Sequence, residues 1–179
     1  MHNIKRKIAA VLLITICFLT TCGFSQKQIL KEYSHVRYIV PENAGFKSFM
    51  DYEKITDETS IQYAVQQECI TGANGIRQIN GRYCIAIGTF FGANVGQVID
   101  ITLENGTVIP AVVGDIKADK DTTETDIFTK YNGCCSEFIV ETNKLPSDIR
   151  RRGNVSKMYT KWDSPVYSFD VYDLYVDEL

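Results

Sequence analysis

The sequence predicts a mainly β domain of the α+β class, a small barrel with helical additions. Three observations support this fold class. Runs rich in Val, Ile and aromatic residues recur along the chain, glycine-containing turns separate them, and one stretch has the apolar period of an amphipathic helix. The 179 residues are 45% hydrophobic and 11% aromatic, which is enough apolar area for one compact core with small appendages.

The N-terminal residues have the form of an export signal. Lys5, Arg6 and Lys7 precede an apolar run, residues 8–19, that is too short for a comfortable bilayer span. The sequence Leu-Thr-Thr-Cys that ends at Cys22 also resembles a bacterial lipobox, in which Cys22 is the lipidated residue. We therefore expect a signal peptide, lipoprotein signal or membrane anchor over 1–25, a tether over 26–34 and one folded domain over 35–179. All three alternatives predict an extracytoplasmic protein of the cell envelope, secreted or held at the membrane by its N-terminal segment.

The first predicted strand of the domain is His35–Val40, because Pro41 ends an alternating apolar run. A loop with large apolar side chains follows, and these side chains are expected to fill the core. A helix is then expected from a cap at Thr56 or Asp57 to about Glu68. Its apolar residues share one stripe that should dock on a sheet: Ile61, Ala64, Val65 and Cys69.

Later segments continue the β pattern. Arg82–Phe91 is the most apolar strand candidate and is expected to be buried on both faces near its middle. Ser136–Glu141 is a further strand, Leu145–Arg152 is a short helix ended by a glycine, and Val166–Val176 is the closing strand. Residues 116–126 are polar and acidic but lack the spacing of a calcium-binding loop, so we expect a solvated loop.

The strongest local signal is a hairpin over Gln97–Val113, centred on Asn105-Gly106. A two-residue type I′ turn there would pair Glu104 with Thr107. In that register one face carries five apolar residues: Ile99, Ile101, Leu103, Val108 and Val112. Asp115 follows at the end of the second strand on the other face, and Gly114 beside it would let a ligand or a second backbone approach. Asp115 is the leading candidate for chemistry, and the alternative is a solvated turn aspartate.

Charge and cysteine content exclude several classes of function. The net charge of −3 and the pI near 5.4 argue against nucleic acid as a partner. The histidines, His2 and His35, and the spacing of the cysteines offer no metal site, and we expect no cofactor. The domain has four cysteines, Cys69, Cys84, Cys134 and Cys135. They allow three disulfide connectivities, and the sequence does not choose between them.

The order of motifs resembles that of the double-psi β-barrel domains of bacterial cell-wall proteins, namely the three-aspartate (3D) domain, rare lipoprotein A and lytic transglycosylase barrels. The resemblance covers about Gly81–Glu141. Asp115 matches the middle aspartate of that family, and Glu137 takes its last acidic position with a conservative change. Gly88 or Thr89 stands where the first aspartate is expected. The resemblance implies a small, double-psi-like, six-stranded barrel.

The same resemblance implies cleavage of peptidoglycan between N-acetylmuramic acid and N-acetylglucosamine. Asp115 would be the general acid and base, and Glu137 would raise its pKa through like charge. Tyr83 and Thr89 would orient the substrate, and the partner would be peptidoglycan or another wall glycan. Two alternatives stay open: a non-catalytic barrel that binds wall glycan or a protein, and a structural envelope lipoprotein. If the protein is an enzyme, the carboxyl groups of Asp115 and Glu137 should converge in one open groove.

Overall fold

The computed structural model describes residues 30, 33–41 and 44–179. The chain divides into two units, Met1–Ser34 and His35–Leu179, and the fold below is that of the second. The predicted export signal and Cys22 lie outside the described residues. Among the residues that the structure describes, no helix has the length and apolar character needed to cross a bilayer.

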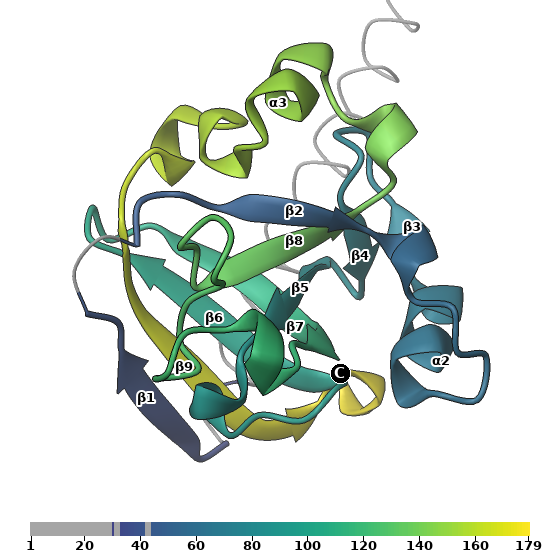
Figure 1. Ribbon diagram of the computed structural model, residues 1–179. Helices are drawn as coiled ribbons and strands as arrows, with labels where there is room; N and C mark the ends of the chain where they lie inside the picture. Colours follow the sequence, from purple (N-terminus) through teal and green to yellow (C-terminus); the bar gives the residue numbers. More distant parts are fainter. Residues whose placement is uncertain (1–29, 31–32, 42–43) are drawn as a thin grey trace, which may run out of the picture. The chain divides into compact units, whose positions relative to one another are not determined.

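A nine-stranded mixed sheet forms the framework of the domain (Figure 1). The strand order is β1-β9-β6-β7-β5-β4-β3. Strand β8 pairs with β5 along the edge opposite β7, and β2 pairs with β8. The strands are β1 (His35–Ile39), β2 (Ser48–Asp51), β3 (Ile70–Thr71), β4 (Arg77–Ile79), β5 (Arg82–Ile87), β6 (Gln97–Leu103), β7 (Val108–Ile116), β8 (Ser136–Val140) and β9 (Val166–Tyr175). Two α-helices, α2 (Ile61–Glu68) and α3 (Ser147–Arg152), and several short 3-10 turns complete the domain.

The mainly β, α+β class is confirmed, but the prediction of six strands closed into a barrel is wrong. The sheet has nine strands and does not close, since its path ends at β1 and β3 and its branch ends at β2. Two pairs are parallel, β5 with β7 and β2 with β8. These pairings join segments far apart in sequence, so no local turn motif predicts them. Strand β2 forms where the sequence predicts a loop.

The hairpin is confirmed, but its predicted register is wrong by one residue. Ile101 pairs with Ile109, and the Leu103 N–H donates to the Thr107 carbonyl at 2.8 Å. The loop therefore has three residues and places Gly106 at φ +80°, a common alternative to the two-residue turn. A shift of one residue exchanges the faces of a strand. Val108 accordingly lies on the other side and is 50% exposed.

Helix α2 docks on the sheet with only part of the predicted stripe, since Val65 and Cys69 pack against the sheet whereas Ile61 and Ala64 are exposed. It begins after Ser60, whose side chain accepts a hydrogen bond from the Tyr63 N–H at 3.1 Å. Ile61 is 66% exposed, whereas Gln66 and Cys69 are buried. A polar glutamine thus takes a place on the docking face, which the apolar pattern of the sequence did not indicate.

Strand β5 has apolar clusters on both of its faces. Ile85 and Ile87 belong to the main core, which also contains Phe91, Phe138 and Phe169. Cys84 points to the other face, into a smaller cluster that includes Cys69 and Ile139 and is packed by Val65 of α2. The predicted burial of β5 on both faces is confirmed, because residues 84–87 are fully buried. Figure 1 shows α2 beside the sheet and α3 above β2 and β8.

Candidate functional site

The two predicted acids lie on either side of the same residue of the central strand. Ala86 of β5 is the partner of Asp115 on β7 and also the partner of Glu137 on β8. Residues directly opposite one another project from the same face of a sheet. Both carboxyl groups therefore lie on the face of Ala86, which is the face of Cys84 and α2. Two strand spacings, about 10 Å, separate their backbones.

Asp115 is a partly buried acid with a raised pKa. Burial is the largest influence and raises the pKa, against hydrogen bonds from the Ile116 backbone and the Gln62 side chain and the charge of Lys117. Glu137 acts in the direction that we expected, but it is the least of the named influences. The elevated pKa is thus mainly a consequence of desolvation rather than of like charge.

Glu137 has its own partners. Lys117 forms an ion pair with it, and both side chains are largely buried, at 15% and 12% exposure. The Asn132 side chain donates a second hydrogen bond to the other carboxylate oxygen at 3.2 Å. The site therefore contains one desolvated acid and one ion-paired carboxylate, which is a combination that lets two acids serve different roles.

Gly114 does not leave room for a ligand. A Cβ at this position would lie 2.6 Å from Ile139 Cδ1 and 3.1 Å from Gln66 Nε2, so the chain's own side chains fill the space. The register of β5 against β7 shifts at this point. This bulge turns Asp115 away from the main core, although Val113, two residues earlier, faces into it.

Of the two predicted substrate-orienting residues, Tyr83 lies on the opposite face of the sheet from the acids, and Thr89 lies just after β5, near them. Tyr83 lies on the main-core side of β5, with its ring 5.1 Å from Trp162 and 6.2 Å from Phe138. Thr89 follows β5, is exposed, and donates to the Asp119 side chain at 2.7 Å. Thr89 is thus near the end of β5 that carries the site, whereas Tyr83 belongs to the aromatic core.

Gly88 stands where the first aspartate of the resembled family is expected, and steric crowding explains why a glycine is present there. A Cβ on Gly88 would lie 1.9 Å from the backbone oxygen of Asp126. Asp126 belongs to the acidic loop after β7, has a φ of +54°, and accepts a hydrogen bond from the Thr122 hydroxyl at 2.6 Å. The loop therefore occupies the place where an aspartate side chain would begin.

A cleft of about 500 Å³ lies along α2. Its lining comes from five residues of the segment 52–58 and from Tyr63, Gln66 and Gln67. Neither Asp115 nor Glu137 lines it, so the expected groove around both acids is not this cleft. Gln62 and Gln66 are four residues apart and share a helix face. The helix face that contacts Asp115 therefore continues into the cleft.

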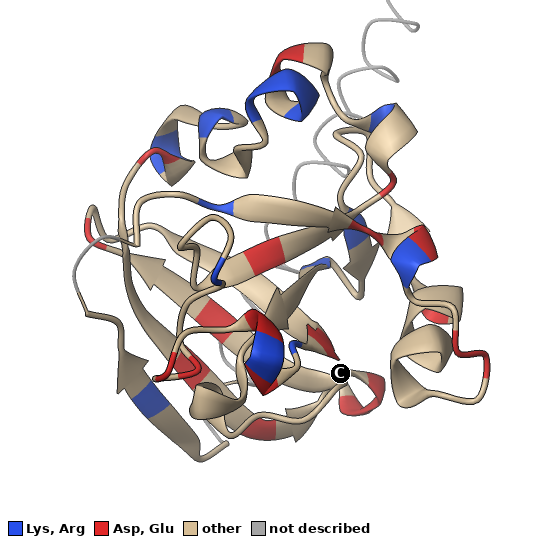
Figure 2. Cartoon of the chain, in the orientation of Figure 1, with Lys and Arg blue, Asp and Glu red and all other residues tan. Residues whose placement is uncertain are grey.

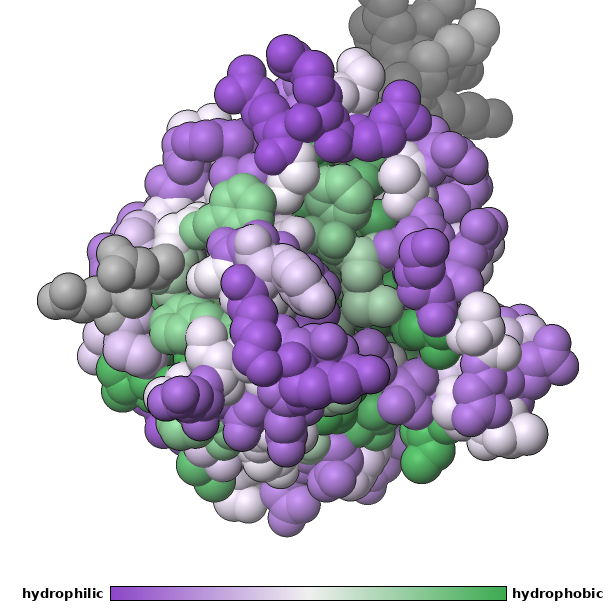
Figure 3. Space-filling view, viewed as in Figure 1, coloured by the Kyte–Doolittle hydropathy of each residue, from purple (hydrophilic) through white to green (hydrophobic). Residues whose placement is uncertain are grey.

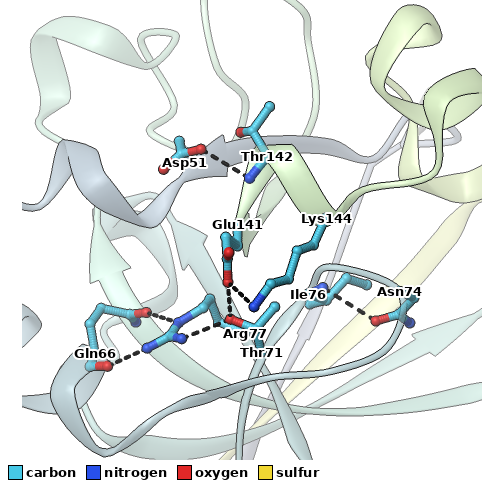
Figure 4. Close-up of polar contacts among 9 residues, drawn as sticks. All are labelled: Asp51, Gln66, Thr71, Asn74, Ile76, Arg77, Glu141, Thr142 and Lys144. Carbon is cyan, nitrogen blue, oxygen red and sulfur yellow. Dashed lines mark hydrogen bonds and ion pairs between the residues drawn. The ribbon is translucent and has the colours of Figure 1, made fainter.

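A polar cluster ties α2 to the sheet beside this cleft (Figure 4). Arg77 of β4 donates to the side chain and backbone carbonyl of Gln66 and to the Thr71 hydroxyl, and Thr71 donates to Glu141 at 2.7 Å. Lys144 forms an ion pair with Glu141 at 3.0 Å. Each charged group in this cluster has a partner, so we assign it a structural role.

The surface around these features is mixed in character. Figure 2 shows basic residues gathered on α3, where Arg150, Arg151 and Arg152 lie, and acidic residues on strands such as β8. Figure 3 shows hydrophilic side chains over most of this face, with hydrophobic ones visible between them. Within the described residues, no group of three or more His, Cys, Asp or Glu side chains could hold a metal ion.

Sequence reasoning missed three residues of the site. Lys117 could have been found, because it lies two residues after Asp115 and so on the same face of an extended strand. Gln62 and Asn132 carry no such signal, since a helix and a loop bring them to the strands from elsewhere.

The comparisons with known proteins give no family. No protein-family model matches the sequence, and no curated protein matches it. The chemistry of this chain is therefore inferred from the geometry of Asp115, Glu137 and Lys117.

Proposed function

We propose that the protein is an exported cell-envelope protein that cleaves peptidoglycan by the lytic transglycosylase reaction, with Asp115 as general acid and base. The observation that carries the proposal is the pair of unlike carboxyl groups on one face of the sheet. Asp115 and Glu137 flank Ala86. The pKa of Asp115 is raised mainly by burial, whereas Glu137 is ion-paired with Lys117. Such a difference in environment is typical of acids that divide catalytic roles.

The reaction needs one acid that gives up a proton and takes another back. Protonated Asp115 would donate to the glycosidic oxygen as the bond to the anomeric carbon of the muramic sugar breaks. A hydroxyl of the same sugar would then form a bond to that carbon and give its proton to Asp115. A positioned acid contributes about 10²- to 10⁴-fold to such a step.

The proposed substrate path follows α2. Gln62 contacts Asp115, and Gln66 on the same helix face lines the cleft. Tyr52 and Tyr63 also line this cleft, and aromatic rings beside amide groups suit the apolar faces and hydroxyls of a sugar chain. A wall glycan with its scissile bond at Asp115 would place neighbouring sugars along the helix. Thr89, just after β5, would contact the other side of the same glycan chain.

We also propose a double-psi-like crossing of strands and a location outside the cytoplasm, at the cell envelope. The two parallel pairs, β5 with β7 and β2 with β8, support a double-psi-like crossing inside the open sheet. The basic residues before an apolar run, and the lipobox-like sequence ending at Cys22, support export and a membrane tether.

Release of soluble fragments from purified peptidoglycan tests the proposal. We expect the full chain to release anhydro-muropeptides, and Asp115→Asn to lower the rate at least 100-fold. Asp173→Asn, which changes an exposed acid on β9, is the matched control and should keep the wild-type rate. Activity should decline as the pH rises through the elevated pKa of Asp115. Undiminished release by a folded Asp115→Asn variant would remove Asp115 from the mechanism.

A second candidate function is binding of wall glycan without cleavage. The observations in its favour are the missing first acid at Gly88 and the engagement of Glu137 by Lys117. This function predicts that the protein co-sediments with peptidoglycan, releases no soluble muropeptides, and binds equally well as Asp115→Asn.

A further inference from the structure

We infer that Cys69 and Cys84 are a disulfide-forming pair that joins the end of α2 to the central strand β5. The two sulfur atoms lie 3.0 Å apart, closer than the 3.5 to 4.0 Å at which non-bonded carbon atoms pack. Bond formation at about 2.05 Å therefore requires only a small approach. The sequence left three pairings open, and the fold selects this one.

The other two cysteines of the domain are in different surroundings. Cys134 contacts the Thr129 hydroxyl at 3.5 Å, and Cys135 is buried in the main core. Cys69 and Cys84 instead share the smaller cluster on the α2 side of the sheet. Cys135 and Cys84 lie in clusters on opposite sides of the sheet, and Cys134 has its own contact with Thr129, so we expect neither Cys134 nor Cys135 to link to this pair.

The chemistry of the pair suits thiol–disulfide exchange. The hydrogen bond from Cys84 is the largest influence on Cys69 and lowers the pKa of its thiol, whereas the same contact and burial raise the pKa of Cys84. Cys69 is also the more accessible, at 7% exposure against none for Cys84. The attacking group in exchange is the thiolate, so Cys69 is the first nucleophile and Cys84 the second.

The oxidant is a disulfide, either of a protein oxidoreductase or of a small thiol. Cys69 attacks one of its sulfur atoms and forms a mixed disulfide, releasing the first thiolate. Cys84 then attacks Cys69 Sγ and releases the second. The two cysteines lose two protons and two electrons, and the oxidant is reduced to two thiols.

The bond would hold α2 in place. Cys69 is the C-cap residue of α2, and 15 positions separate it from Cys84. A disulfide that closes a loop of this size restricts the conformations of the unfolded chain. We expect this restriction to raise the melting temperature of a domain of this length by roughly 5 to 15 °C. The inference stands on this geometry and does not depend on the reaction proposed for Asp115.

Thiol mapping of the full chain tests the pair. The protein, produced by export and purified without reductant, is incubated with oxidised glutathione, denatured, alkylated and digested for mass spectrometry. We expect a linked peptide that joins Cys69 to Cys84, with Cys134 and Cys135 alkylated. Cys134→Ser should keep the link. Alkylation of both Cys69 and Cys84, or a link through Cys134 or Cys135, would overturn the inference.

Thermal unfolding gives an independent readout. Reductant should lower the melting temperature of the oxidised wild type by roughly 5 to 15 °C and leave that of the double variant Cys69→Ser/Cys84→Ser unchanged. Should that variant fail to fold, the wild-type mapping alone decides. An equal response of wild type and double variant to reductant would contradict the assignment.

Discussion

Gly88 offers a sharp test of how the acidic loop after β7 packs on the end of β5. Its backbone angles, φ −76° and ψ 167°, suit any residue, so alanine at this position causes no backbone strain. The added Cβ would lie 1.9 Å from the Asp126 oxygen, and real Cβ contacts are not shorter than 3.0 Å. The carbonyl must therefore move from 1.9 to at least 3.0 Å, which is a displacement of about 1.1 Å.

The cost of Gly88→Ala follows from that displacement. Overpacking of a tight site costs about 1 to 3 kcal/mol, and loss of the Thr122–Asp126 hydrogen bond adds about 1 kcal/mol. The gain from a stiffer unfolded chain offsets about 0.5 kcal/mol. We expect a net loss of about 1.5 to 3.5 kcal/mol in the free energy of unfolding, or a fall in melting temperature of about 3 to 14 °C.

Gly45→Ala is the matched control. It makes the same change where no atom lies within 4 Å of the new Cβ, so it should leave stability unchanged or raise it by up to about 1 kcal/mol. Urea unfolding followed by circular dichroism measures both variants, and limited proteolysis reports opening of the loop. Equal stability of the two variants would refute the steric explanation for glycine at position 88.

Three further predictions concern buried charges. Arg82 is almost fully buried and donates to two backbone carbonyls and to Asp100. Arg82→Met should therefore lower the free energy of unfolding, measured in urea, by about 3 to 5 kcal/mol. Adding Asp100→Asn should recover part of this loss, because it removes the unpaired carboxylate. Asp115 has a pKa raised above 3.8, so its carboxylate opposes folding at neutral pH. Asp115→Asn should accordingly raise the melting temperature at pH 7, with no difference below about pH 3.8; a lower melting temperature at pH 7 would contradict this sign. Burial lowers the pKa of Lys47 from 10.5 to about 8, so the unfolded chain binds the proton more tightly and wild-type stability should rise between those pH values. Lys47→Met should abolish this rise, whereas exposed Lys144→Met should keep it.

The local pattern of the sequence was enough to locate several elements. The strands at β1, β5, β8 and β9 and the hairpin of β6 and β7 were predicted because their signals are short-range: alternation, β-branched residues and an Asn-Gly turn. The predicted register of the hairpin was wrong by one residue. The turn takes three residues instead of two because Gly106 alone adopts the left-handed conformation, and sequence alone does not distinguish these two turns.

Asp115 shows how a correct placement can result from two compensating errors. The predicted register was displaced by one residue, and the bulge at Gly114 was not predicted. Each change turns a strand residue to the opposite face. Together they leave Asp115 on the face away from the main core, as expected. The burial that raises its pKa depends on the packed domain, and the strand pattern gave no measure of it.

The sequence by itself determined the mainly β class, the apolar central strand, the hairpin and the two acids worth testing. Those features depend on residue types at neighbouring positions. Only the tertiary structure decided that Asp115 and Glu137 flank Ala86, that Lys117 and Gln62 join them, and that Cys69 meets Cys84. Parallel pairing and helix docking bring together segments that are distant along the chain, and the free energy of those contacts comes from burial on the whole sheet rather than from any local pattern.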